Sequence, residues 1–149
     1  MTLTATKLFM NWTGATFTPT TGSPVAITRI TDAKFNKSVD LEQFKGDIAL
    51  FVQAIASPTQ HRSIDVTSGD VATLASLAQG AIGSLTIQLG DFNNKFVATG
   101  GAISITLTTC VIGSNSADGA HGKAASAQIN FTAFDATGGV TDPFVVAVL

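Results

Sequence analysis

Residues 102–111, AISITLTTCV, decide the fold class because apolar and polar side chains alternate along them. The apolar positions are Ile103, Ile105 and Leu107, and the polar positions between them are Ser104, Thr106 and Thr108. Successive side chains of a β-strand point to opposite faces, so this period of two places all the apolar side chains on one face. The segment therefore predicts a strand with one buried face.

Residues 125–134 repeat this pattern later in the chain. Ile129, Phe131 and Ala133 alternate with Asn130, Thr132 and Phe134, so that Phe134 is an apolar exception on the polar face. Similar segments rich in Thr, Val, Ile and Phe are separated by turn-forming residues, which is typical of short strands. The other expected strands are residues 3–10, 12–17, 25–31, 48–56, 62–66, 84–89 and 144–148.

One segment has helical rather than strand periodicity. Val71, Leu74, Ala75, Leu77 and Ala78 recur at spacings of three and four, after the start signal TSGD and before Gly80. One amphipathic helix cannot form a layer, so we expect it to close an open end or flank of a β structure. The prediction is a mainly β chain, a β-sandwich or barrel with one flanking α-helix at about residues 70–79, in a single domain over 1–149.

The composition indicates self-assembly. Charged residues make up 12% of the 149 residues, against roughly 25% in typical soluble domains, while hydrophobic residues make up 45%. A chain with so few charges is expected to cover part of its surface with copies of itself. A neutral, threonine-rich monomer is the alternative on composition alone.

Charge and cysteine content exclude several classes of function. A net charge of −2 does not neutralise many phosphates, which argues against tight nucleic-acid binding but permits DNA to pass along a wall. The single cysteine, Cys110, excludes an internal disulfide framework and is expected to be buried. Lys7 and Asn11 interrupt the apolar N-terminus, so we expect no signal peptide and folding in the cytoplasm. Residues 48–56 are too short for a membrane anchor.

No constellation of catalytic or metal-binding residues emerges. His61, His121 and Cys110 show no spacing typical of a metal site. His61, Ser63 and Asp65 would share one face of a strand, but a triad needs its base within hydrogen-bond reach of both partners, usually from different elements. A solvent-facing or interface strand explains them better. We expect no enzyme activity, and no catalytic, cofactor-binding or metal-binding residue.

Three stretches are expected to be loops. Residues 18–24 form a turn-rich connection, and residues 113–123 a mobile surface loop. Residues 32–47, DAKFNKSVDLEQFKGD, combine charge with Phe35, Val39, Leu41 and Phe44. This extended segment is either a hairpin extension or a docking loop.

The C-terminal residues 143–149, PFVVAVL, have high β-propensity and no side-chain charge. Left unpaired, such a strand favours aggregation. We expect it to pair either inside its own sheet, the favoured arrangement, or with a neighbouring subunit. The candidates for inter-subunit pairing are Phe144, Val145, Val146 and Val148.

The order of segments resembles a known family. The quoted stretches are FKGD at 44–47, PTQHRSIDVTSGD at 58–70, QGAIGSLTIQLGD at 79–91 and FTAFDATGGVTDP at 131–143. From about residue 25 onward the chain resembles the major tail tube protein of long-tailed bacteriophages. The tube proteins of type VI secretion systems and contractile injection machines are similar.

This resemblance implies a β-sandwich that forms hexameric rings, whose inner sheets join into a continuous barrel and stack into a tube for DNA. It implies contacts with other tail proteins (tape measure, tail tip, tail terminator and, in a contractile tail, sheath), and a place in the virion tail after synthesis in the host bacterial cytoplasm. In such families a long loop reaches the next ring, and residues 32–47 fit that role. The inter-ring contacts expected there are Phe35, Lys37, Phe44 and Lys45.

Two other functions stay open at this point. A head-decoration or tail-completion subunit of a virion would share the Thr/Gly-rich β texture. A small ligand-binding barrel or enzyme would need a closed pocket with convergent polar groups, for which the sequence offers no cluster.

Overall fold

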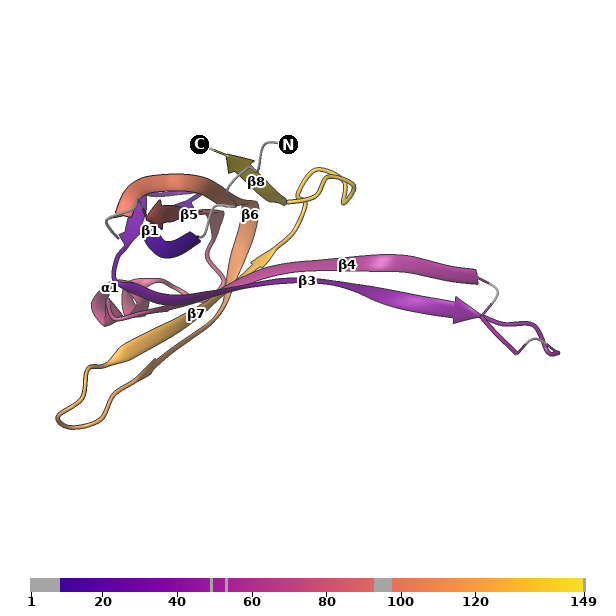
Figure 1. Cartoon of the computed structure of the whole chain (residues 1–149), viewed down its shortest axis with the longest axis horizontal. Helices are drawn as coiled ribbons and strands as arrows, with labels where there is room; N and C mark the ends of the chain where they lie inside the picture. Colours follow the sequence, from indigo (N-terminus) through magenta and orange to yellow (C-terminus); the bar gives the residue numbers. More distant parts are fainter. Residues whose placement is uncertain (1–8, 49, 53, 93–97, 149) are drawn as a thin grey trace, which may run out of the picture.

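The computed structural model describes residues 9–48, 50–52, 54–92 and 98–148. It contains eight strands and one short helix (Figure 1). The strands are β1 Phe9–Pro19, β2 Val25–Ile27, β3 Ile30–Phe44, β4 Ala54–Ser68, β5 Ile82–Phe92, β6 Ala98–Asp118, β7 Ser126–Ala133 and β8 Phe144–Val148, and the helix is α1 Val71–Ser76.

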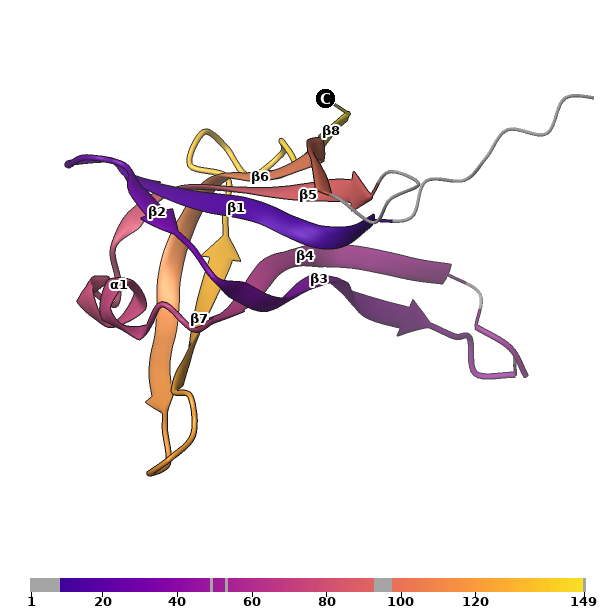
Figure 2. The same cartoon turned by 60° about the vertical axis from the view of Figure 1, so that its left-hand side comes forward.

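All strand pairs are antiparallel, and one long strand joins two layers. Strand β6 is 21 residues long. Its first part lies between β5 and β8, and its later part pairs with β7. One layer is therefore β2-β1-β5-β6-β8 and the other is β6-β7-β4-β3 (Figures 1 and 2). The predicted β-sandwich with one flanking helix is confirmed.

The hydrophobic core fills the space between the two layers. Both alternating segments bury the face that the sequence predicts, with Leu107 and Phe131 fully buried. Phe131 also contacts Phe17 of the opposite layer, with ring centroids 5.5 Å apart. The other fully buried large side chains are Ile27, Ile64, Leu74, Leu85, Ile87, Ile112 and Ile129.

Helix α1 is shorter than the predicted segment 70–79. It ends at Ser76 because Leu77 adopts an extended backbone conformation. The side-chain amide of Asn115 donates hydrogen bonds to the carbonyl oxygens of Leu74 and Leu77, which satisfies groups that a longer helix would have used. The helix contacts β2, β6 and β7 and covers one end of the sandwich.

Several predicted boundaries were wrong, and the predicted strand 25–31 is divided into β2 and β3 at residues 28–29. Residues 113–118 are not part of a surface loop: they continue β6 and pair with β7 as far as Asp118↔Ser126, so the turn begins at residue 119. Among the described residues of the predicted strand 48–56, those from Ala54 onward belong to a strand. The predicted strand 3–10 lies outside the described residues except for Phe9 and Met10, which begin β1.

The segment 32–47 is mostly strand rather than loop, which corrects the expected extended loop and favours the hairpin alternative. β3 pairs with β4 from Ile30↔Ser68 out to Phe44↔Ala54, whereas β7 pairs with β4 only over Ser63–Ser68. Beyond this point no other described strand pairs with β3 or β4. Residues 38–61 therefore form a two-stranded hairpin, here called the arm, that projects well clear of the body (Figure 1).

Candidate assembly surfaces

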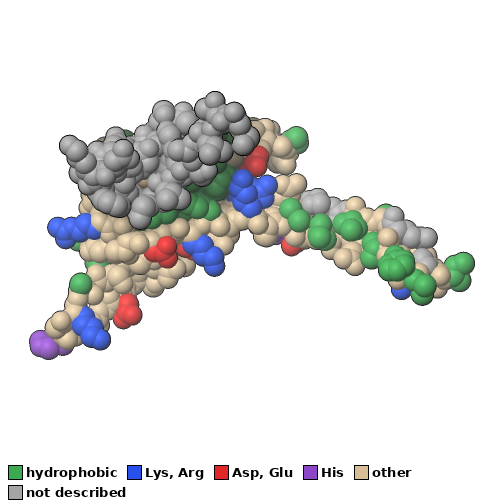
Figure 3. Space-filling view, in the orientation of Figure 1, with side chains coloured by type: hydrophobic (Ala, Val, Ile, Leu, Met, Phe, Trp, Pro, Cys, Tyr) green, Lys and Arg blue, Asp and Glu red, His purple; other side chains and the backbone are tan. Residues whose placement is uncertain are grey.

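The arm exposes large apolar side chains along its length. Two isolated strands are marginally stable in water, and a contiguous apolar surface marks an interaction site. Figure 3 shows hydrophobic side chains following the arm on the visible face. The residues, between 41% and 99% exposed, are Val39, Leu41, Phe44, Ile48, Leu50, Phe51, Val52 and Ile55.

The four predicted inter-ring contacts are divided between the two ends of the arm. Phe44 and Lys45 are exposed at the outer end of the arm. Phe35 is half-buried in the body, 5.6 Å from the ring of Trp12 and 6.0 Å from that of Phe144. Lys37 lies where the arm begins, with Nζ 4.1 Å from the centroid of the Phe144 ring. Lys37, Phe44 and Lys45 are therefore exposed and Phe35 is half-buried, and the role of these four residues as inter-ring contacts stays a prediction.

Two cations face each other at the base of the arm. Lys37 of β3 is directly opposite Arg62 of β4, and like charges in that position repel. Two residues at and just before the start of β8 offset this repulsion. Asp142 lies 3.3 Å from Arg62 Nε, and the Phe144 ring faces Lys37. The base of the arm is thus held to the C-terminal strand rather than free to swing.

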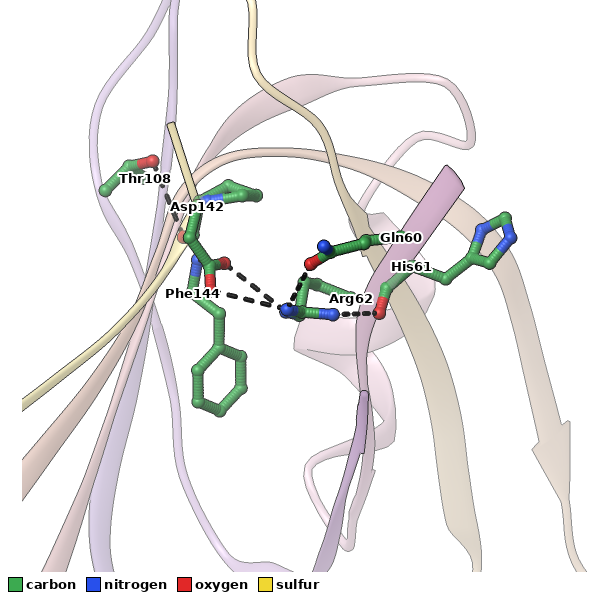
Figure 4. Close-up of polar contacts among 7 residues, drawn as sticks. Gln60, His61, Arg62, Thr108, Asp142 and Phe144 are labelled. Carbon is green, nitrogen blue, oxygen red and sulfur yellow. Dashed lines mark hydrogen bonds and ion pairs between the residues drawn. The ribbon is translucent and has the colours of Figure 1, made fainter. Parts of the chain in front are cut away.

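Arg62 is the best-anchored side chain of this cluster (Figure 4). It is 13% exposed, and its guanidinium donates hydrogen bonds to the His61 carbonyl oxygen and to Gln60 Oε1. Asp142 also accepts a hydrogen bond from the backbone N–H of Phe144. That N–H, with smaller contributions from Arg62 and Lys37, holds the pKa of Asp142 below its usual value.

The connection between β7 and β8 is built around one carboxylate. Asp135 accepts hydrogen bonds from the Thr137 hydroxyl and from the backbone N–H groups of Thr137, Val140 and Thr141, at 2.7–2.9 Å. These bonds, led by the Thr137 hydroxyl, hold the pKa of Asp135 well below its usual range. The loop presents Val140, 92% exposed, at its outer side.

A groove separates this loop from the base of the arm. Its volume is about 620 Å³, and we call it the base groove. Arg62 and Gln60 line it from β4, while Phe134, Asp135, Val140 and Pro143 line it from the loop. Phe134, the apolar exception in the alternation of β7, is therefore a groove residue.

The layer that contains β8 has a free strand edge at each end. β8 pairs with β6 from Leu107↔Phe144 to Ile103↔Val148, which confirms pairing inside its own sheet. Among the described residues no strand pairs with its other side, where Val145 and Val146 are about half exposed. At the opposite end, β2 covers only Ala15–Phe17 of β1, so residues 9–14 have one free side within the described chain.

The described residues show no catalytic or metal-binding arrangement. His61 bonds Asp40 at 3.0 Å, while Asp65 accepts hydrogen bonds from Asn36 and Asn130, so His61 and Asp65 are not paired. No group of His, Cys, Asp and Glu in this part of the chain could hold a metal ion. Cys110 is buried, and burial raises its pKa to about 12.

The six-residue α1 is too short to cross a bilayer, and the described part of the chain offers no other candidate helix.

Sequence reasoning missed several of these residues. The pairing of Arg62 with Asp142 could not be expected from the sequence, because it joins positions 80 apart in the chain. Ile48, Leu50 and Phe51 were expected inside a strand, and they lie at the turn of the arm instead. Phe134 carried the one usable signal, since it interrupts a regular alternation.

No protein-family model matches this chain, and no curated protein matches it. Solved structures do. One match is a chain of the anti-feeding prophage baseplate, with a TM-score of 0.58, 12% identity, and coverage of 99% of this chain and 97% of that one. Another is a chain of the anti-feeding prophage cap, described as the tube-terminating cap, with the same TM-score and identity and coverage of 100% and 97%.

The chain has the fold of an anti-feeding prophage subunit. The likeness extends over the whole of both chains, so the sandwich and the arm are compared together rather than one fragment. At 12% identity this likeness shows the fold alone. It does not single out the major tail tube protein of a long-tailed phage, which was the finer prediction.

Proposed function

We propose that this chain is a structural subunit of a tail tube, in a phage or a related contractile injection particle, and not an enzyme. Copies join edge to edge into hexameric rings, and the rings stack into a hollow conduit. The observation that carries the proposal is the arm, a two-stranded extension with eight exposed large apolar side chains on a body of tail-like fold. Such a surface needs a protein partner.

The free edges support ring formation. In the layer β2-β1-β5-β6-β8, strands β1 and β6 run in one direction and strands β5 and β8 run in the opposite direction. Placing β8 of one copy beside residues 9–14 of β1 in the next copy therefore continues the antiparallel sheet. The same contact repeated head to tail closes into a ring when the rotation allows it, and closure removes the exposed edges.

The arm supports stacking of the rings. From residue 38 to residue 44 it extends roughly 20–25 Å from the body, at about 3.4 Å per residue. An arm of that length reaches a copy in an adjacent ring. We propose Phe44 and Lys45 as inter-ring contacts, together with the apolar residues at the turn of the arm.

The remaining partners follow from this role. A tube of this kind meets tape-measure, tail-tip and tail-terminator proteins, and a sheath where the tail contracts. A net charge of −2 suits transient, non-specific passage of DNA rather than binding. The proposed location is the tail of the particle, with synthesis in the bacterial cytoplasm.

A second candidate is a ring that ends a tube. The two matched assemblies are a baseplate and a tube-terminating cap, which favours a subunit that adjoins a tube as well as one that forms it. A terminal subunit would give single rings, whereas a tube subunit would give long stacks.

The arm provides the test. Leu50→Asp with Phe51→Asp places charges on two of the exposed apolar residues at its turn. The control, His121→Asp, lies on the exposed turn between β6 and β7. Sedimentation velocity should show large assemblies for the unaltered chain and the control, and nothing larger than single rings for the arm variant. Large assemblies of unchanged size from the arm variant would contradict the proposal.

A further inference from the structure

The outer end of the arm and the base groove are two unoccupied surfaces of the same chain. Ile48, Leu50 and Phe51 are 99%, 88% and 83% exposed at the turn of the arm. The base groove lies at the other end of the arm, next to the body. A chain cannot fill its own groove with its own arm turn, because the strands of the arm are paired from base to turn.

The base groove has the size and chemistry for a short protein segment. At about 620 Å³ it falls in the range of roughly 300–1,000 Å³ found for pockets that enclose a ligand. Phe134 and Val140 are exposed on its lining, and Pro143 adds apolar surface. Two large apolar side chains entering it would cover surface that is otherwise left in water.

The geometry of a stack brings the two surfaces together. The arm begins at the wall of the base groove, since Thr59 and Gln60 belong to both. When a second copy is shifted along the direction of the arm, the base of its arm lies near the arm of the first copy. Its base groove therefore lies there too. The contact joins two different patches, so it propagates from copy to copy without end, as a stack requires.

Charge favours the same pairing. Arg62 is neutralised by Asp142, whereas Asp135 on the groove lining is bonded to N–H and O–H groups and has no cationic partner among the described residues. Lys45 on the turn of the arm has no ion-pair partner in that part of the chain either. A lysine brought beside an unneutralised carboxylate adds attraction and fixes the orientation.

We propose that the base groove is the receptor for the arm of a second copy: Leu50 and Phe51 enter it against Phe134 and Val140, and Lys45 approaches Asp135. This inference rests on the proposed stacking function and names the surface that receives the arm. The Asp135-centred loop holds Val140 in place before the arm arrives, so little ordering is needed on binding.

A disulfide trap tests the contact directly. The chain contains only Cys110, which is buried and, with its pKa raised to about 12, slow to react. The test protein carries Phe51→Cys and Val140→Cys, and the matched control carries Phe51→Cys and His121→Cys, all at exposed positions. A disulfide needs Cα atoms within about 7 Å, so only true neighbours are linked.

Each copy of the test protein would link its arm to one neighbour and its groove to another. After mild oxidation of assembled protein, non-reducing electrophoresis should show a ladder of covalent multimers for the test protein, and at most dimers for the control and for each single variant. Electron microscopy of the same samples before oxidation establishes whether they are stacked.

The outcomes separate the two proposals. Stacked tubes without a ladder, or with a ladder from the control pair, would overturn the base groove as receptor and leave the tube function intact. A chain that forms no stack with or without the substitutions would contradict the tube function, and the receptor with it.

Discussion

At the base of the arm, a few charged and polar side chains hold apolar surfaces in position. Lys37 and Arg62 face each other across the arm, and the carboxylate of Asp142 and the ring of Phe144 offset that repulsion. None of these pairings could be predicted from the sequence, because they join Lys37 and Arg62 to residues that lie 80 or more positions later in the chain. Phe131 and Leu107 could be predicted as core residues, since a local alternation fixes their side of the strand.

The core prediction leads to a stability test. Phe131→Ala removes a fully buried ring that contacts Phe17, and such truncations cost about 3–5 kcal/mol of unfolding free energy. Thr132→Ala, at the exposed neighbouring position, is the control and should change stability by about 0.5 kcal/mol or less. Urea denaturation of dilute, unassembled protein measures both. Equal losses in the two variants would contradict the assigned side of the strand.

Asp135 gives the loop a dependence on pH. Its pKa is lowered in the folded chain, so its contribution to stability is present above the usual aspartate value, near about 4, and is lost as the pH falls towards the folded-state value. Asp135→Asn should therefore lower stability at neutral pH and flatten the acid limb of the stability profile. Thermal unfolding between pH 7 and pH 2 measures this. Parallel profiles for the two proteins would show that the carboxylate does not hold the loop.

Among the secondary-structure elements, β8 and the arm were predicted with different success. The limits of β8, Phe144–Val148, and its place in its own sheet agree with the sequence, because an uncharged β-rich terminus has few other options. Residues 32–47 were expected to be either a hairpin extension or a docking loop, because charged residues and a glycine obscure the strand pattern there. This segment forms a strand despite its composition, because its backbone pairs with β4. Only the register of the hairpin shows this pairing.

The free edge of β8 leads to a test of ring formation. Val145→Lys places a charge on an exposed residue of this edge, which is how natural sheets prevent edge pairing. Val145→Thr is the control, because it keeps a β-branched side chain without charge. Light scattering should show ring-sized particles for the control and monomers for the lysine variant, with similar thermal stability. Rings of normal size from the lysine variant would place the ring contact elsewhere.

For the whole molecule, the fold class could be predicted from the sequence, whereas the proposed contact surfaces could not. Alternating strands predicted the sandwich, while the self-assembly expected from the low share of charged residues stays a prediction. The base groove, in contrast, lies between β4 and the loop before β8. No local sequence pattern indicates that these two distant segments lie side by side. The likeness to chains of a baseplate and a tube-terminating cap shows the fold of the chain.

The most direct test of the central claim is negative-stain electron microscopy of the purified, unaltered chain over a range of concentrations, with light scattering on the same samples. A tube subunit should form sixfold rings with a central hole, and these rings should stack into tubes as the protein concentration rises. A compact monomer that persists at the highest concentration, and that added tail-tip and baseplate proteins do not convert into rings, would contradict it.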